Sequence, residues 1–581
     1  MGIRSDRAIW EAESEGLELI ELTIGDLLDQ QAAARPDREA LVYRYPELGL
    51  DLRLTYRQYR DEVNRLAKGL LALGIEKGEH VAVWATNVPE WLMLMMALAK
   101  IGAVMVTVNT NYRAAELEYV LRQGDVATLA MIAAYRDNSF LDAIYSIAPE
   151  LKQITDPARE ELRCARLPLL KRVIFVGDTP QTGLLPYSHA VALGGSLTDE
   201  ALQARQSSVT PHDVSQIQYT SGTTGFPKGA MLTHHGVVNN ALLSSVRWGI
   251  RADDRLVTPM PFFHVAGCIL HALGALTRGA TLIPLITFDP AKQLELIEAE
   301  RATYSGGVPT MLIAMLQHPY FQEGLQAGEF DLSALRQVGS GGSPVPVVLM
   351  EQVKEKMGAD VAIVFGQTEA SPIITQTLPS DSFELKSATV GIPQPHTEVK
   401  IVNPQTSEPV GFGEAGELLA RGYLVMKGYY RMPDKTAETI DADGWLHTGD
   451  LATMNEKGYV NIVGRVKEMV IRGGENLFPA EIEAFLMRHP KVAEAQVIGV
   501  PDAFMGEELC ALVRLKPDER AEEEELRAYC HANISRQKTP KYIRFVTGFP
   551  LTASGKVKKY ELREQLITEL GLEDVARLKT A

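Results

Sequence analysis

The chain has 581 residues, of which 46% are hydrophobic and 23% are charged, and its formal net charge is −16. This length exceeds what one hydrophobic core usually serves, so we expect a globular protein of two or more domains. The acidic balance argues against a nucleic-acid partner, because neutralising phosphates requires a basic surface.

No targeting segment or membrane span is predicted. The first twenty residues carry four glutamates and one aspartate, which suits neither a secretory signal nor a transit peptide. The longest apolar run, Trp91 to Ala99, is about half of a bilayer span. Four widely spaced cysteines without a CxxC pattern fit a reducing compartment. We therefore expect a cytoplasmic protein with no integral membrane segment.

Strand and helix signals alternate along the first half of the chain. Thr55 and Gln58 form a capping-box pattern that opens a helix, and Gly74 ends it. Residues 140–210 carry charges and turn residues with little periodicity, so we expect a partly irregular segment there. The other predicted elements are strands over 80–85, 103–108, 172–176 and 280–285, and helices over 90–100 and 291–300. This alternation predicts an α/β fold with parallel-rich sheets layered with helices.

The most informative segment is Thr220-Ser221-Gly222-Thr223-Thr224-Gly225-Phe226-Pro227-Lys228-Gly229. Its glycines let backbone N–H groups approach an anion, its hydroxyls add donors, and its lysine adds a point charge. The segment therefore predicts a loop that cradles a polyphosphate. It is not the Walker loop, because Pro227 stands where that pattern requires a glycine followed by Lys-Ser/Thr.

Two further segments carry groups suited to a nucleotide and its metal. The apolar run 361–365 predicts a buried strand, and Gly366-Gln367-Thr368-Glu369 follows it. The Thr368 hydroxyl can donate to a phosphate while the Glu369 carboxylate takes Mg²⁺. Asp450, after a Thr-Gly turn, is a good acceptor for two ribose hydroxyls, although a type I turn with a capping aspartate also accounts for it.

After Arg465 the pattern changes to short elements. Helices are predicted over 479–488 and 522–532, and strands over 495–500 and 510–515. They indicate a small α+β domain of about 115 residues, which is long enough for its own core. We therefore divide the chain into a large domain, 1–464, and a small domain, 465–581.

These segments, in this order, resemble the adenylate-forming (AMP-binding) superfamily, in its acyl-CoA synthetase branch. Within this branch, the sequence is most similar to the sequences of the medium-chain fatty acid CoA ligases. The resemblance implies a large N-terminal domain, a small mobile C-terminal domain, and ATP/AMP, Mg²⁺ and coenzyme A as ligands. The positions that it implies for nucleotide and CoA are Thr220, Ser221, Gly222, Thr223, Thr224, Gly225, Lys228, Gly342, Ser343, Phe365, Gly366, Gln367, Asp450, Arg465, Gly473 and Gly474.

The resemblance also implies roles for individual residues. Thr368, Glu369 and Lys556 are expected to be catalytic, and Glu369 and Thr224 are expected to hold Mg²⁺. Phe365 is expected to pack against adenine. Lys556 would reach the carboxylate and the α-phosphate in one domain conformer only.

The same resemblance assigns the small domain two further features. Lys467 corresponds to the hinge about which residues 465–581 rotate. Gly473 and Gly474 would form part of the wall of the pantetheine tunnel, where a backbone without side chains leaves room.

The resemblance places the acyl site at His264, Val265, Gly267 and Gly341. His264 suits a polar ring over the carboxylate, although a histidine hydrogen-bonded in the core is an equally good interpretation. The small residues here leave volume, and no cation stands among them to pair a second carboxylate. This favours an alkyl chain over a flat aryl group, and the resemblance favours chains of medium to long length.

The implied activity is that of an ATP-dependent fatty acid CoA ligase, which forms acyl-AMP and pyrophosphate and then acyl-CoA and AMP. The alternatives are an aryl-CoA ligase and an acyl-AMP ligase that loads a carrier protein. Lys556, Glu369 and Asp450 argue against a third alternative, a non-catalytic nucleotide-binding module. The expected partners are a carboxylic acid, ATP and CoA. The sequence leaves open whether the protein forms a homodimer.

Overall fold

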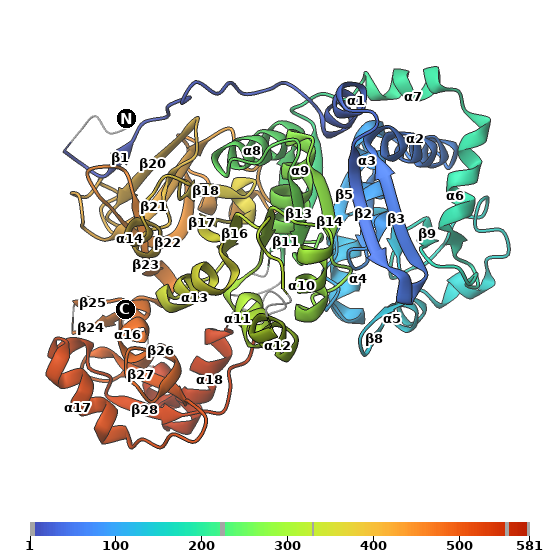
Figure 1. Cartoon of the computed structure of the whole chain (residues 1–581). Coiled ribbons are helices and arrows are strands. Elements are labelled where there is room, and N and C mark those ends of the chain that lie inside the picture. Colours follow the sequence, from blue (N-terminus) through green and yellow to red (C-terminus); the bar gives the residue numbers. More distant parts are fainter. Residues whose placement is uncertain (1–5, 221–226, 328–329, 474, 552–556, 578–581) are drawn as a thin grey trace. The chain divides into compact units, whose positions relative to one another are not determined.

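The computed structural model describes residues 6–220, 227–327, 330–473, 475–551 and 557–577 (Figure 1). The chain forms two compact units. The larger unit is Glu11–Glu398 with Ala420–Leu446, and the smaller unit is Met1–Trp10, Val399–Leu419 and His447–Ala581. The division at 464/465 stays a prediction.

The first sheet of the larger unit has seven strands in the order β10-β9-β6-β4-β5-β11-β12. Neighbouring strands are parallel, except that β12 runs antiparallel to β11. The strands are β4 His80–Trp84, β5 Val104–Thr107, β6 Val126–Met131, β9 Arg172–Phe175, β10 Leu185–Pro186, β11 Val214–Thr220 and β12 Lys228–Thr233. The strands predicted near 80, 103 and 172 are thereby confirmed.

The second sheet has nine strands in the order β19-β18-β17-β16-β15-β13-β14-β2-β3. Its centre, from β17 to β2, is parallel, and β18, β19 and β3 are antiparallel additions at its edges. The strands are β2 Glu39–Tyr45, β3 Leu50–Thr55, β13 Arg255–Thr258, β14 Thr281–Pro284, β15 Tyr304–Gly306, β16 Gln337–Gly341, β17 Asp360–Gly366, β18 Ile373–Gln376 and β19 Ile392–Pro393. The strands predicted over 280–285 and 361–365 are confirmed.

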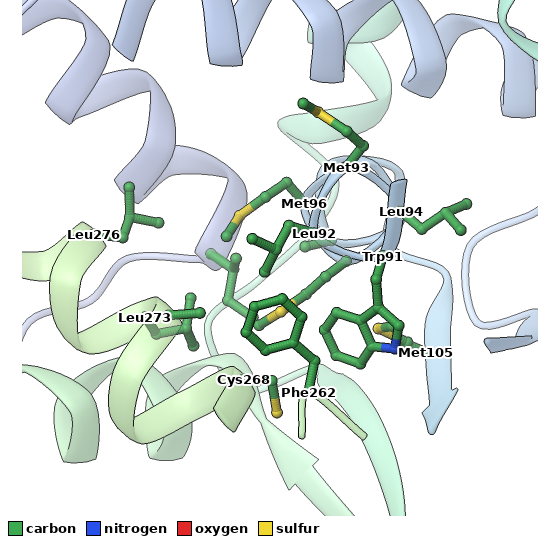
Figure 2. Packing of buried hydrophobic residues seen from close by; sticks show 14 of the residues in the cluster. Trp91, Leu92, Met93, Leu94, Met96, Met105, Phe262, Cys268, Leu273 and Leu276 are labelled. Carbon is green, nitrogen blue, oxygen red and sulfur yellow. The ribbon is translucent and has the colours of Figure 1, made fainter. Parts of the chain in front are cut away.

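Helices fill the space between these two sheets and join them in one apolar core. They are α1 Ile24–Ala34, α2 Tyr56–Ala72, α3 Pro89–Ile101, α8 His234–Arg247, the π-helix η4 Ala266–Leu273 and α9 Gly274–Arg278. Figure 2 shows this core, where the Trp91 ring of α3 lies 5.3 Å from the Phe262 ring, centroid to centroid. Helix α3 is buried along nearly its whole length, and its residues 91–99 are all apolar. No helix among the described residues is both long and apolar enough to cross a membrane.

Residues 140–210 are partly irregular, as we expected, but they also contain helices that the sequence did not indicate. Three short helices form there: α5 Phe140–Ile147, α6 Tyr187–Leu193 and α7 Asp199–Gln206. The ring of Phe140 stacks on Trp84 at a centroid distance of 3.6 Å, so α5 covers the outer face of the first sheet. Helices of about two turns show too few repeats for a clear helical period, which explains the difference.

The smaller unit carries two sheets. The first has the order β1-β20-β21-β22-β23 and consists of β1 Ile9–Trp10, β20 Thr397–Val402, β21 Gly416–Gly422, β22 Leu446–Met454 and β23 Val460–Arg465. The second has the order β25-β24-β27-β26, with β28 beside β27, and consists of β24 Val470–Arg472, β25 Glu475–Leu477, β26 Val492–Asp502, β27 Gly506–Leu515 and β28 Tyr542–Phe545. The helices around this second sheet are α16 Pro479–Leu486, α17 Glu523–Asn533 and α18 Lys559–Glu569. They confirm the predicted small α+β arrangement.

Candidate active site

Several predicted site residues lie outside the described part of the chain. These are Ser221, Gly222, Thr223, Thr224, Gly225, Gly474 and Lys556. The other site residues are divided between the two units, and each group is described by itself.

In the larger unit the candidate residues follow the carboxyl ends of neighbouring parallel strands. The segment with His264 follows β13, Gly342 and Ser343 follow β16, and Gln367 to Glu369 follow β17. In the sheet β13 pairs with β15, β15 with β16, and β16 with β17, all parallel, so these three segments leave the same edge. Open parallel sheets bind ligands at this edge.

The base of the predicted phosphate loop is a hairpin formed by β11 and β12. Thr220 and Lys228 lie opposite each other in the antiparallel register, and the Thr220 hydroxyl donates to the Lys228 carbonyl at 3.4 Å. The Tyr119 hydroxyl donates to the Pro227 carbonyl at 3.0 Å. Both ends of the loop are therefore fixed by the edge of a sheet.

A tyrosine that sequence reasoning missed connects this loop base to Glu369. The Lys228 ammonium lies 4.1 Å from the centroid of the Tyr429 ring. The Tyr429 hydroxyl donates to Oε1 of Glu369 at 2.6 Å. Burial, followed by the charge of Glu369, raises the pKa of Tyr429, so the hydroxyl keeps its proton. Nothing in the sequence indicated this contact, because a tyrosine that follows a glycine is common in hydrophobic cores and does not by itself indicate a functional role.

Glycine and a short helical turn set the backbone after β17. A Cβ at Gly366 would lie 2.0 Å from the Pro372 carbonyl oxygen, so only glycine allows this approach. The Gln367 N–H donates to the same carbonyl at 2.9 Å. Thr368 and Glu369 then enter a 3-10 turn, and the Met426 N–H donates to the Glu369 carbonyl at 2.9 Å. Phe365, Gln367 and Thr368 are half-buried.

The segment after β16 has one glycine with a left-handed backbone. Gly342 has φ of +78°, which strains any other residue, and it is exposed together with Ser343. Gly341 pairs with Val364 in the parallel register of β16 and β17. Gly342 and Ser343 therefore follow a strand that lies beside the Phe365 segment.

His264 stands just before the π-helix η4. Its Nδ1 accepts a hydrogen bond from the Ala266 N–H at 3.2 Å, and its side chain is half-buried. This contact orients the ring and leaves it partly accessible. Val265 beside it is buried.

The two glycines predicted to open an acyl tunnel do not leave side-chain space. A Cβ at Gly267 would lie 2.2 Å from the Pro261 carbonyl oxygen, and one at Gly341 would lie 2.4 Å from that of Val364. Backbone occupies the volume beside both residues, so the expectation of volume at these positions is wrong. Their presence in the acyl site stays a prediction.

Three buried rings lie further along the same sheet face. The Tyr304 hydroxyl lies 1.9 Å from where a Cβ of Gly339 would stand, and Trp248 lies 5.2 Å from the Tyr304 ring. His271 of η4 lies 5.8 Å from Tyr304 and shares a hydrogen bond of 2.5 Å with the Thr258 hydroxyl. Burial lowers the pKa of His271 to about 4, so its ring is neutral. Gly339 on β16 thus faces an uncharged aromatic cluster.

In the smaller unit two predicted nucleotide residues are joined directly. Asp450 of β22 and Arg465 of β23 are opposite each other in the antiparallel register. Nε of Arg465 lies 2.9 Å from Oδ1 of Asp450, whose side chain is only 6% exposed.

A second set of contacts fixes the turn before Asp450. The Thr448 hydroxyl donates to the Leu418 carbonyl at 2.6 Å and accepts from the Asp450 N–H at 3.1 Å. Oε1 of Glu417 accepts from the Gly449 N–H at 3.1 Å, and Gly449 has φ of +70°. Glu417, which the sequence did not single out, therefore holds the turn that presents Asp450.

The predicted hinge and the predicted tunnel wall also lie in the smaller unit. Lys467 is exposed on the 3-10 turn Val466–Glu468. Gly473 has φ of +59°, its N–H donates to the Met505 carbonyl at 2.8 Å, and a Cβ there would lie 2.6 Å from Cε of Met505. The hinge and tunnel roles stay predictions.

The chain matches two family models. Residues 28–430 match the AMP-binding enzyme model, and residues 481–556 match the model of the AMP-binding enzyme C-terminal domain.

Among curated proteins, the chain is 48% identical over 556 residues to YngI of Bacillus subtilis, which carries the name of an acyl-CoA synthetase. That match covers 96% of this chain and 99% of YngI. The chain is 41% identical to the mitochondrial medium-chain acyl-CoA ligase ACSF2 of Mus musculus, over 95% of this chain and 89% of ACSF2. Among solved structures, the anthranilate CoA ligase AuaEII in complex with anthranoyl-AMP has a TM-score of 0.81 and 27% identity, covering 96% of this chain and 100% of that one.

Proposed function

We propose, from the premise that this chain belongs to the AMP-binding enzyme family and is an acyl-CoA ligase, that its substrates are fatty acids of medium to long chain. In the proposed reaction the carboxylate oxygen attacks the α-phosphorus of ATP, and the bond to pyrophosphate breaks. The CoA thiol, losing its proton, then attacks the acyl carbon and displaces AMP. The products are acyl-CoA, AMP and pyrophosphate.

One geometric fact supports the adenylation step most directly. Tyr429 contacts both Lys228, which is predicted to bind phosphate, and Glu369, which is predicted to bind metal. The Lys228 ammonium lies 4.1 Å from the centroid of the Tyr429 ring, and Oε1 of Glu369 lies 2.6 Å from the Tyr429 hydroxyl. A cation and a carboxylate held around one rigid ring suit a nucleoside triphosphate with its Mg²⁺ ion.

The donor set at Glu369 fits Mg²⁺. Glu369 offers a hard carboxylate oxygen beside the one that Tyr429 occupies. Among the residues described, no three His, Cys, Asp or Glu side chains come together as a metal-binding group. A single carboxylate together with substrate phosphates and water is the usual protein environment of Mg²⁺. When bound, the ion would neutralise charge on the phosphates.

Positive charge near the α-phosphate is the second electrostatic requirement, because the attacking carboxylate and the phosphate are both anionic. Lys556 remains our candidate for this role in one domain conformer, with Lys467 as the hinge. Asp450 and Arg465 are the candidates for contacts with the ribose and the rest of the nucleotide.

A fatty acyl chain is the substrate favoured by the cluster next to Gly339. Tyr304, Trp248 and His271 are buried and present no charge, His271 being neutral because its pKa is lowered to about 4. Rings of this kind suit an apolar chain, and no cation stands among the three to pair a second carboxylate. The mouse relative is named for medium-chain acids. The aryl alternative is supported by the same rings, which could stack on an aromatic acid. It is also supported by the similarity to AuaEII.

A panel of acids tests the proposal. Straight-chain acids from butyrate to stearate, benzoate, cinnamate and anthranilate are each incubated with ATP, Mg²⁺ and CoA, and acyl-CoA and AMP are measured. We expect equal amounts of AMP and acyl-CoA, with the highest kcat/KM for an alkyl acid of eight or more carbons, since each buried methylene adds roughly 0.8 kcal/mol.

Two results would contradict the proposal. A preference for benzoate or anthranilate over octanoate would establish the aryl alternative. Acyl-AMP that accumulates with CoA present, and is consumed only when a carrier protein is added, would establish an acyl-AMP ligase.

A further inference from the structure

Tyr429 contacts both charged groups of the larger unit's candidate nucleotide site, Lys228 and Glu369. Its ring lies beneath the Lys228 ammonium at 4.1 Å, and its hydroxyl donates to Glu369 at 2.6 Å. The side chain is 3% exposed, so both contacts are shielded from bulk water. Shielding strengthens both a cation–π contact and a charge-assisted hydrogen bond.

The backbone holds Tyr429 in this place from both sides. The segment around it lies along β12, where the Met231 N–H donates to the Gly428 carbonyl at 2.9 Å and the Tyr430 N–H to the Gly229 carbonyl at 2.8 Å. The Tyr429 N–H donates to the Thr436 hydroxyl at 2.9 Å. The ring therefore has little freedom to leave Lys228 or Glu369.

We propose that Tyr429 is a positioning residue that sets the orientation of the Glu369 carboxylate toward the metal and of the Lys228 ammonium toward the phosphates. The proposal rests on the proposed function, because it concerns the same nucleotide site. The hydroxyl satisfies one oxygen of Glu369 and thereby directs the other. The ring, independently of the hydroxyl, fixes the ammonium above its face.

The two contacts can be separated by substitution. Tyr429→Phe removes the hydrogen bond to Glu369 and keeps the ring under Lys228, whereas Tyr429→Leu removes both. The next residue offers a matched control, since the Tyr430 hydroxyl donates to Asp125 at 2.9 Å, a carboxylate outside the candidate site. Tyr430→Phe therefore removes an equivalent hydrogen bond that has no role in the proposal.

The experiment measures binding as well as turnover. Affinity for a non-hydrolysable ATP analogue is determined by calorimetry over a range of Mg²⁺ concentrations, and ATP–pyrophosphate exchange is determined over the same range. We expect Tyr429→Phe to raise the half-saturating Mg²⁺ concentration about 10-fold, the usual effect of losing a partner that orients a metal ligand. Its affinity for the analogue without Mg²⁺ should stay that of the wild type. Tyr429→Leu should weaken that metal-free affinity as well, by about 2- to 5-fold.

A purely structural role for Tyr429 predicts a different outcome. In that case Tyr429→Phe would lower thermal stability without changing the Mg²⁺ dependence, and the effects of Tyr429→Phe would add to those of Glu369→Gln. If Tyr429 acts through Glu369, the double variant Tyr429→Phe/Glu369→Gln should have the Mg²⁺ dependence of Glu369→Gln alone. An unchanged Mg²⁺ curve for Tyr429→Phe, equal to that of Tyr430→Phe, would overturn the proposal.

Two further measures keep the result decisive. If Tyr429→Phe is too unstable to assay, Thr436→Val, which loosens the backbone of Tyr429 while keeping its side chain, should shift the Mg²⁺ curve in the same direction; no shift would overturn the proposal. Failure of the proposed function would be visible in the wild type, as an absence of acyl-CoA with every acid. The calorimetric arm needs no acid, so the two failures are distinguishable.

Discussion

Asp450 and Arg465 face each other across two antiparallel strands, and Oδ1 of the aspartate lies 2.9 Å from Nε of the arginine. Two residues chosen from separate sequence motifs are thus joined in one ion pair within the smaller unit. The aspartate is nearly buried and the arginine is 42% exposed, so the acceptor is enclosed while the cation is accessible to solvent.

Asp450→Asn should weaken ATP and AMP binding together, since ribose is common to both nucleotides. Losing hydrogen bonds to a charged acceptor costs about 1.5–3 kcal/mol, so affinity should fall by about 10-fold or more. Equilibrium binding of AMP and of an ATP analogue measures this. The exposed Asp443→Asn is the control and should change neither affinity. An Asp450→Asn protein that binds AMP as tightly as the wild type would remove Asp450 from the ribose site.

Gly267→Ala should destabilise the whole enzyme rather than shorten its preferred acid. The added Cβ meets the Pro261 carbonyl, and overpacking of this kind costs about 1–3 kcal/mol. Thermal unfolding and the acid panel together separate the two effects. Gly195→Ala is the matched control, because a Cβ there meets nothing within 4 Å. A selective loss of long acids at wild-type stability would show that Gly267 borders the chain after all.

Tyr304→Leu should move the acid of highest kcat/KM toward longer chains, if the acyl group ends at the ring beside Gly339. Each methylene that the new space accepts is worth about 0.8 kcal/mol. Tyr43 provides the control. The buried hydroxyls of Tyr43 and Tyr304 both lack a hydrogen-bond partner among the described residues. Tyr43→Leu should lower stability, by about 0.5–3 kcal/mol, without changing the length profile. An identical profile for both variants would place Tyr304 away from the acyl chain.

Two buried histidines should make the fold less stable in mild acid. Burial lowers the pKa of His234 and of His271 to about 4, from an ordinary value of 6.5 in the unfolded chain. Between these values the unfolded state binds more protons, so stability is full above pH 6.5 and is lost as pH falls toward 4. Each histidine contributes at most about 1.4 kcal/mol per pH unit in this window.

Unfolding free energies at a series of pH values test this expectation. His271→Gln should flatten the dependence relative to the wild type, and the mostly exposed His212→Gln should leave it unchanged. A His271→Gln protein with the slope of the wild type would show that folding does not lower the pKa of this imidazole.

Strong local signals explain what could be predicted from the sequence. Thr55 and Gln58 make the reciprocal capping bonds that their spacing indicated, and α2 begins at Tyr56. Gln367 to Glu369 follow β17, in which residues 361–363 of the predicted apolar run are buried. Such features depend on neighbours in sequence, so one sequence suffices to find them.

Contacts between distant segments could not be predicted in the same way. Tyr429 reaches Glu369 because residues near 428 lie along β12, a pairing that no local pattern encodes. The space beside Gly267 and Gly341 depends on where the Pro261 and Val364 carbonyls lie, and a small residue indicates equally an open pocket or a close backbone approach.

Adenylation of the acid is the central claim, and the fate of one oxygen atom tests it most directly. The enzyme is given octanoate with ¹⁸O at both carboxylate oxygens, together with ATP, Mg²⁺ and CoA, and the products are analysed by mass spectrometry. If the carboxylate attacks the α-phosphorus and CoA then displaces AMP, each AMP carries one ¹⁸O and pyrophosphate carries none. Label in inorganic phosphate, with ADP as the nucleotide product, would contradict the account.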